Sequence, residues 1–169
     1  MTSDQKKVLK GAISGIVAMG LLLWVLFHLL PDPEANDLAS RLAYALKWDA
    51  VAALPLFFML AVIGNARFGS EAIDPTVGKD SSTMIVDSKV AGNTLEQFAI
   101  FVVGTLALAA GVEGEAVKIV GAAAITFVLM RIAFWIGYRI KPVYRAFGFS
   151  STAYMNLGLL IAAIWFGFA

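Results

Sequence analysis

The 169-residue sequence contains no cysteine and only one histidine, His28. The absence of cysteine excludes disulfide bonds, thiolate metal sites and a cysteine nucleophile, and a single histidine cannot form a metal cluster by itself. Charged residues are also scarce, at 15%, whereas hydrophobic residues make up 60% and the mean hydropathy is +0.81. Soluble domains have about 25% charged residues, so this composition places the chain in a membrane. A net charge of only +1 argues against nucleic acid as a partner.

Five apolar stretches are long enough to cross a membrane as helices, because about 20 residues span about 30 Å of hydrocarbon. Pro55, inside the second stretch, predicts a kink rather than a break. The expected spans are residues 11–30, 42 or 47–66, 88–112, 116–139, and a last helix that Ser150 or Ser151 caps and that reaches Ala169. The first span ends in a Leu-Pro-Asp-Pro run rather than a cleavage site, so we expect it to be retained. The sequence therefore predicts an all-α integral membrane protein.

Lysine and arginine are distributed unevenly between the two sides of these spans. Nine of the thirteen lie in the N-terminal segment and in the loops after spans two and four, three lie on the opposite side, and Arg131 lies within a span. By the positive-inside rule, the N-terminus is cytoplasmic. We therefore expect a bacterial inner (cytoplasmic) membrane protein, with Asn93, Tyr138 and Arg145 near the cytoplasmic face.

The third span carries a polar face at its start. Lys89, Asn93 and Glu96 are spaced i, i+4 and i+7, so a helix places a cation, an amide and a carboxylate in line. A charged side chain at mid-bilayer costs about 2.5–3.5 kcal/mol, so such groups need partners or a function. Asn93 fits interhelical hydrogen bonding as well as ligand binding.

The fourth span supplies a matching face. Arg131, Tyr138 and Arg145 recur at intervals of seven, and a helix that continued through all three would place them on one side. The short connection at 111–115 makes the two spans antiparallel neighbours, so we expect their polar faces to form a pocket for an anionic ligand. Simpler roles also fit: Arg131 in a buried ion pair with Glu96, Tyr138 in the interfacial aromatic belt, and Arg145 among the positive-inside charges.

These motifs resemble those of the MAPEG proteins, a group that includes microsomal glutathione transferases, the microsomal prostaglandin E synthase and a non-catalytic lipoxygenase-activating protein. The likeness covers residues 48–169 and rests on the following residues: Lys89-x-x-x-Asn93-x-x-Glu96, Arg131, Gly137-Tyr138 and Arg145. The resemblance implies a four-helix domain over residues 42–169. Residues 1–41 then form an N-terminal tail, an extra transmembrane helix and an acidic loop.

The resemblance also implies a homotrimer that binds glutathione between subunits near the cytoplasmic side. The substrate-binding residues that it implies are Lys89, Asn93, Glu96, Tyr138, Arg131 and Arg67. Arg145 matches the arginine that stabilises the thiolate in some members, so it is the expected catalytic residue. Three positions depart from the family pattern, because some enzymes of the family carry other residues where this chain has Gly92, Phe134 and Ala146.

We expect a membrane-bound transferase or peroxidase that uses glutathione or another thiol and acts on lipophilic electrophiles. A guanidinium beside a thiol lowers the thiol pKa from about 8.5, so Arg145 favours the thiolate and no protein cysteine is required. The alternative is a non-catalytic MAPEG-like protein for lipid binding or membrane-complex assembly. In that case the span from Gly11 to Leu30 docks another membrane protein, and Gly11 and Gly15 form a GxxxG pair that allows close helix approach.

Overall fold

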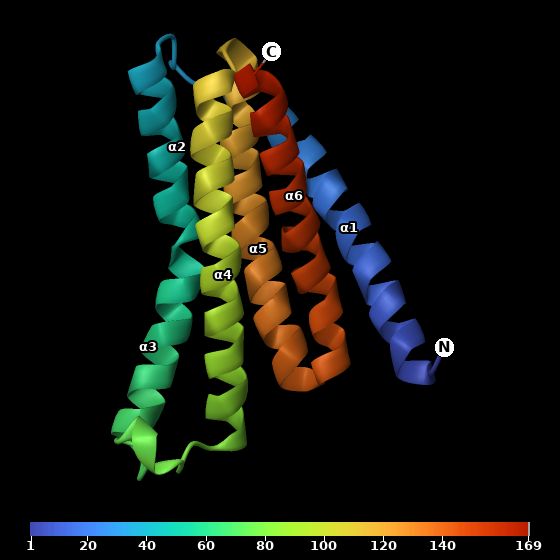
Figure 1. The fold of residues 1–169 in the computed structure, drawn as a ribbon, viewed down its shortest axis with the longest axis vertical. Helices are drawn as coiled ribbons and strands as arrows, with labels where there is room; N and C mark the ends of the chain where they lie inside the picture. The colour runs from blue at the N-terminus through green and yellow to red at the C-terminus, as the bar shows by residue number, and fades with distance from the viewer. Residues whose placement is uncertain (169) are drawn as a thin grey trace.

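The computed structural model describes residues 1–168, and these residues form a bundle of long helices with short 3-10 connections (Figure 1). The elements follow one another in this order: α1 Ser3–Leu29, α2 Leu38–Ala52, α3 Leu54–Phe68, η1 Pro75–Val77, α4 Ser82–Gly111, η2 Gly114–Val117, α5 Lys118–Ile140, η3 Pro142–Arg145 and α6 Ala146–Phe168. Within this range, five segments are long and apolar enough to cross a membrane, with α2 and α3 counted as one. The predicted all-α membrane fold with an additional N-terminal helix is confirmed.

The second span changes direction where its two helices meet. Pro55 is the second residue of α3 and has no backbone N–H, so the Val51 carbonyl lacks its usual helical donor. The Ala53 N–H donates to that carbonyl and to the Asp49 carbonyl, and Ala53 itself keeps helical backbone angles. The chain therefore bends at this point without leaving the helical conformation, as a proline-induced kink requires.

Several helices begin at other residues than predicted. α1 begins at Ser3 and α2 at Leu38, ahead of the expected residues 11 and 42 or 47. The third span begins at Ser82, six residues before the expected start, because the Ser81 hydroxyl accepts a hydrogen bond from the Met84 N–H and caps the helix. The last span begins at Ala146, so the prediction of a cap at Ser150 or Ser151 is wrong. Both serines are buried within α6, and Ser151 Oγ donates to the Phe147 carbonyl at 2.7 Å. The predicted end at Ala169 lies outside the described residues.

The packing of α1 shows how its GxxxG pair is used. A Cβ atom added at Gly15 would lie 2.2 Å from the Phe147 carbonyl oxygen and 2.8 Å from Ser151 Oγ, whereas one at Gly11 would lie 3.4 Å from the Ala146 Cβ. Glycine therefore lets α1 contact the backbone of α6 directly. This close contact is made within the chain.

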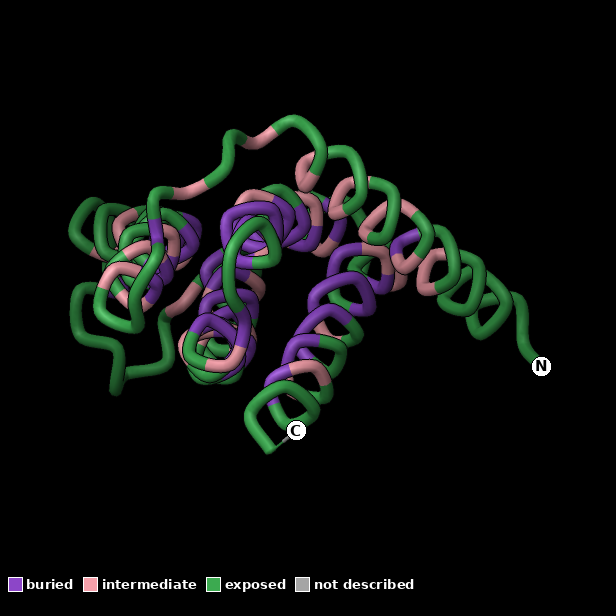
Figure 2. The backbone as a smooth tube through the Cα atoms, turned by 90° about the horizontal axis from the view of Figure 1, so that it is seen from above, coloured by how far each residue is buried: buried purple, intermediate pink, exposed green. Residues whose placement is uncertain are grey.

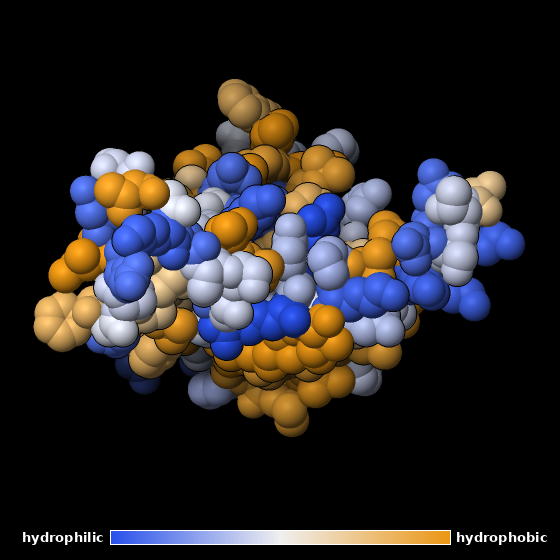
Figure 3. Space-filling model, turned by 90° about the horizontal axis from the view of Figure 1, so that it is seen from below, coloured by the Kyte–Doolittle hydropathy of each residue, from blue (hydrophilic) through white to orange (hydrophobic). Residues whose placement is uncertain are grey.

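The centre of the bundle is formed around α5, the most buried of the spans (Figure 2). Phe101 of α4 and Phe127 of α5 are fully buried, with ring centroids 4.7 Å apart, and Leu159 of α6 packs in the same cluster. We call the end at which α1, α4 and α6 begin the N-terminal end of the bundle. Hydrophilic side chains gather across this end, whereas apolar side chains cover the flanks (Figure 3).

Ion pairs hold the opposite end together. Arg41 at the start of α2 is buried, donates to the Ala109 carbonyl at 3.2 Å and pairs with Glu113 at 3.0 Å. Lys118, the first residue of α5, lies 2.7 Å from carboxylate oxygens of Asp32 and Glu115. These contacts join the loop after α1 and the α4–α5 turn to the helices beside them.

Candidate functional site

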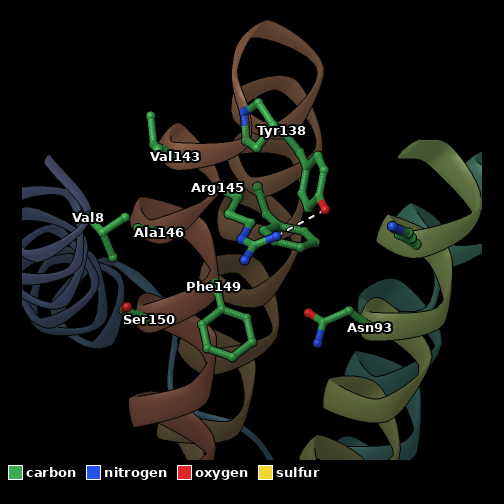
Figure 4. A pocket seen from close by; sticks show the side chains of 11 residues that line it. Val8, Asn93, Tyr138, Val143, Arg145, Ala146, Phe149 and Ser150 are labelled. Atoms are coloured by element: carbon green, nitrogen blue, oxygen red, sulfur yellow. Dashed lines mark hydrogen bonds between the residues drawn. The ribbon is translucent and has the colours of Figure 1, made fainter. Parts of the chain in front are cut away.

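A cavity of about 600 Å³ opens at the N-terminal end of the bundle (Figure 4). Side chains from α1, α4, α5, η3 and α6 surround it. The residues that line the cavity are Val8, Lys89, Asn93, Phe134, Tyr138, Pro142, Val143, Arg145, Ala146, Phe149 and Ser150. None of them is acidic, and neither Lys89 nor Arg145 takes part in an ion pair within residues 1–168. The cavity therefore presents two positive charges that pair with no carboxylate of residues 1–168.

The α4 side of the cavity follows the spacing predicted from the sequence. Lys89 and Asn93 are one helical turn apart and both line the cavity. Glu96, the third residue of the predicted face, is exposed and does not line the cavity, but its Oε2 accepts a hydrogen bond from Asn93 Nδ2 at 3.3 Å. Glu96 therefore orients the Asn93 amide from outside the cavity.

The opposite side is formed where the chain reverses between α5 and α6. Arg145 lies in η3, beyond the end of α5, so the single continuous helix through Arg145 that was considered from the sequence does not occur. The reversal still brings Arg145 Nη1 to 2.9 Å from Tyr138 Oη, with the guanidinium 5.1 Å from the ring centroid. A Cβ atom at Gly137 would lie 2.9 Å from the Tyr144 carbonyl oxygen, so glycine permits this tight return.

Arg131 lies behind the cavity rather than in its lining. Its side chain is fully buried and donates to Asn93 Oδ1 at 3.0 Å, to Thr152 Oγ1 at 2.7 Å and to the Gly148 carbonyl at 3.2 Å. The guanidinium also stands 4.4 Å from the centroid of the Phe134 ring. Arg131 thus holds the oxygen of the Asn93 amide, whereas Glu96 holds its nitrogen.

The direct Glu96–Arg131 ion pair considered from the sequence is not formed within residues 1–168. The amide of Asn93 lies between the two charges, since Nδ2 donates to Glu96 and Oδ1 accepts from Arg131. Asn93 is therefore both an interhelical contact and a cavity residue, and the two roles considered from the sequence coexist.

Arg67 lies apart from the cavity that the other predicted residues share. It is near the end of α3, and its guanidinium binds Asp80 through Nη2 at 2.9 Å and through Nε at 3.4 Å. It does not line the cavity of its own chain. Its predicted role as a ligand contact stays a prediction.

Sequence reasoning missed Asp87, which joins α4 to α5 beside the site. Its buried carboxylate accepts hydrogen bonds from Arg139 Nε at 2.8 Å and from Trp135 Nε1 at 2.7 Å. The i, i+4 spacing of Trp135 and Arg139 could have indicated a shared partner. The expected third span begins at residue 88, one position after Asp87, and therefore does not include Asp87. Gln97 was also missed, although its backbone and side-chain oxygens both accept from Asn156 Nδ2 of α6.

Together, these features define a helical integral membrane protein with a cationic, ligand-sized cavity at one end of its bundle. The chain belongs to the MAPEG family, whose family model matches residues 42–165. The predicted family resemblance is confirmed.

Two curated relatives are also similar to the chain, and both are named Transmembrane protein 79. The Mus musculus protein is 19% identical over 164 residues, which cover 96% of this chain and 42% of the relative. The Bos taurus protein is 20% identical over 157 residues, which cover 92% of this chain and 40% of the relative. The chain thus spans less than half the length of these relatives. No solved structure matches the chain significantly.

Proposed function

We propose that this MAPEG protein is a membrane-bound transferase or peroxidase that uses glutathione or another anionic thiol and acts on lipophilic electrophiles. The observation that carries the proposal is the cavity itself. Lys89 and Arg145 face it without a carboxylate partner among the described residues 1–168, and Asn93 and Tyr138 stand beside them with polar groups. A peptide-like anion matches this lining, because its carboxylates can pair with Lys89 and Arg145 and its amides can form hydrogen bonds with the Asn93 side chain.

The proposed chemistry requires a thiolate, and Arg145 is placed to favour it. A free thiol has a pKa of about 8.5, and a neighbouring guanidinium lowers that pKa. Because Arg145 donates to Tyr138 Oη, the Tyr138 hydroxyl hydrogen is free to point to a ligand sulfur. The thiol loses its proton to solvent, its electron pair forms the new bond to the electrophilic carbon, and the leaving group departs with the bonding electrons.

The apolar lining of the cavity suits the second substrate. Phe134, Val143 and Phe149 face the same space as the cationic groups. Phe134 and Ala146 also stand where some enzymes of the family carry polar side chains, which argues against prostaglandin chemistry in this chain. A lipophilic electrophile that reaches the cavity from the bilayer would then meet the thiolate inside the cavity.

Assembly and orientation belong to the same proposal. We propose a homotrimer, in which Arg67 of one chain approaches the cavity of a neighbour. We also propose that the N-terminal end of the bundle faces the cytoplasm in an inner membrane, because most lysines and arginines lie at this end. A soluble thiol would then reach the cavity from the cytoplasm.

The first test measures thermal unfolding of the detergent-purified protein against glutathione concentration. A ligand that binds only the native state adds about 2.7 kcal/mol at a hundredfold excess over its dissociation constant. Arg145→Ala should weaken binding about tenfold or more, because a hydrogen bond to a charged group contributes about 1.5–3 kcal/mol. Glu96→Gln should weaken it less, because Glu96 acts through Asn93.

Lys141→Ala is the matched control, since it removes one exposed positive charge at the same end without touching the cavity lining. A saturable shift that persists in Lys141→Ala and weakens in Arg145→Ala supports the proposal. If glutathione and other small thiols shift neither the wild type nor the control, the thiol-dependent function is refuted. The non-catalytic lipid-binding or assembly role then takes its place.

A further inference from the structure

The cavity has one side toward α4 and an opposite side on which apolar side chains of α1, η3 and α6 gather, and we call this opposite side the apolar half. Asn93 and Tyr138 lie toward α4, whereas Val8, Val143 and Ala146 lie together on the opposite side (Figure 4). Val8 belongs to α1, the helix that precedes the residues matched by the family model. One wall of the apolar half therefore comes from outside the four-helix unit.

The position of Val8 is fixed by the rest of α1. Val8, Gly11 and Gly15 are spaced i, i+3 and i+7, so they share one helical face. Gly15 holds that face against the Phe147 carbonyl and Ser151. At the other end, the Thr2 side chain accepts from the Gln5 N–H and caps α1 before Val8 is reached. Val8 thus lies between a helix cap and a close helix contact.

We propose that α1 is the specificity wall of the cavity: Val8 contacts the alkyl chain of the lipophilic co-substrate and limits its size. This inference rests on the proposed thiol-dependent function and adds the element that selects the second substrate. A chain held against Val143, Ala146 and Phe149 meets Val8 on its remaining side. Without α1 that side would be open, and the cavity would set no limit on chain length there.

The absence of cysteine in the chain permits a direct test, because a single introduced cysteine is the only thiol that can react. Val8→Cys is labelled with N-ethylmaleimide in lipid nanodiscs, alone and with S-methylglutathione, S-hexylglutathione or S-decylglutathione. Leu9→Cys is the matched control, because Leu9 is 48% exposed, close to the 42% of Val8, and does not line the cavity. All ligands are first checked for a thermal shift of the wild type.

S-Decylglutathione should slow the labelling of Val8→Cys on the order of tenfold at a concentration well above its dissociation constant, because only the unoccupied protein reacts. S-Methylglutathione should leave this rate close to that of the free protein, and Leu9→Cys should respond to neither ligand. Val8→Trp supplies a second readout. Its larger side chain fills part of the apolar half, so it should weaken binding of the decyl compound and spare that of the methyl compound.

The outcomes separate the two proposals. If no S-alkylglutathione shifts the unfolding temperature of the wild type, the proposed function fails and the specificity wall fails with it. If the compounds bind but chain length affects neither Val8→Cys labelling nor the affinity of Val8→Trp, the specificity wall alone is refuted. Protection of Leu9→Cys to the same extent would mean that the ligand covers the surface of α1 non-specifically, which also overturns the inference.

Discussion

Gly15 offers the sharpest test of how α1 is held in the bundle. Gly15→Ala adds one methyl group 2.2 Å from the Phe147 carbonyl oxygen, and atoms closer than 3.0 Å must move apart. Overpacking of this kind costs about 1–3 kcal/mol. Gly20 is the matched control: it lies in the same helix, and a Cβ atom there meets nothing within 4 Å. Both substitutions gain the same helix propensity, about 0.5–1 kcal/mol. The difference between the two variants in free energy of unfolding therefore isolates the packing cost.

The assay is thermal unfolding followed by intrinsic tryptophan fluorescence, with the two variants compared directly. We expect Gly15→Ala to melt below Gly20→Ala by roughly 4–8 °C, taking about 2 kcal/mol for the overpacking and the usual scaling for chains of 150–250 residues. Helix propensity alone predicts no such loss, because it favours alanine over glycine at both positions.

A local readout shows whether α1 itself has moved. The Cβ position of Gly11 lies 3.4 Å from the Ala146 Cβ, close to the range that disulfides span. Gly11→Cys with Ala146→Cys should therefore cross-link readily in the otherwise cysteine-free chain, and Gly15→Ala should slow that reaction. Equal melting temperatures and equal cross-linking in the Gly15 and Gly20 variants would refute the close contact between α1 and α6.

Two further predictions concern charged groups. Asp87→Asn should lower the unfolding temperature, because the buried carboxylate accepts hydrogen bonds from Arg139 and Trp135. In a double-mutant cycle, adding Arg139→Gln should recover part of this loss. Additive losses of stability would contradict the Asp87–Arg139 pairing. At the start of α2, the hydrogen bond from the Ser40 N–H lowers the pKa of the Asp37 carboxyl below its usual value. The stabilisation from this carboxylate is present above its unfolded-state pKa and is lost as pH falls through its folded-state pKa. An acid titration of the wild type followed by helix content should therefore include a step from Asp37, and Asp37→Asn should lack it. An unchanged titration curve in Asp37→Asn would contradict the prediction.

The sequence was sufficient to predict the spans, because hydropathy sums over about 20 residues and tolerates local irregularity. Helix ends depend on single contacts instead. The Ser81 cap adds a polar turn to α4, and no hydropathy pattern shows it. The start of α6 at Ala146 depends on the reversal at η3, which brings Tyr144 against Gly137. Serines at 150 and 151 fit a cap equally well by composition, and only the three-dimensional turn rules them out.

Four predicted site residues, Lys89, Asn93, Tyr138 and Arg145, line the same cavity. Helical spacing suffices for the first two, because they are one turn apart on one helix. Val8 could not be found in this way, because the residues that it faces lie more than 130 positions further along the chain. Sequence periodicity describes one helix at a time and says nothing about which distant helix packs against it.

Within the described part of the chain, the charges of the site are arranged so that those lining the cavity are the ones left without a charged partner. Arg131 is buried and would be costly without a partner, but Asn93 links it to Glu96 through the two ends of one amide. The deep positive charge and the outer negative charge are thus joined into a unit with no net charge. Lys89 and Arg145 have no such link within residues 1–168, so the positive potential of the cavity comes from these two side chains. An anion would therefore be held by Lys89 and Arg145, while Arg131 would act on it only by fixing the orientation of Asn93.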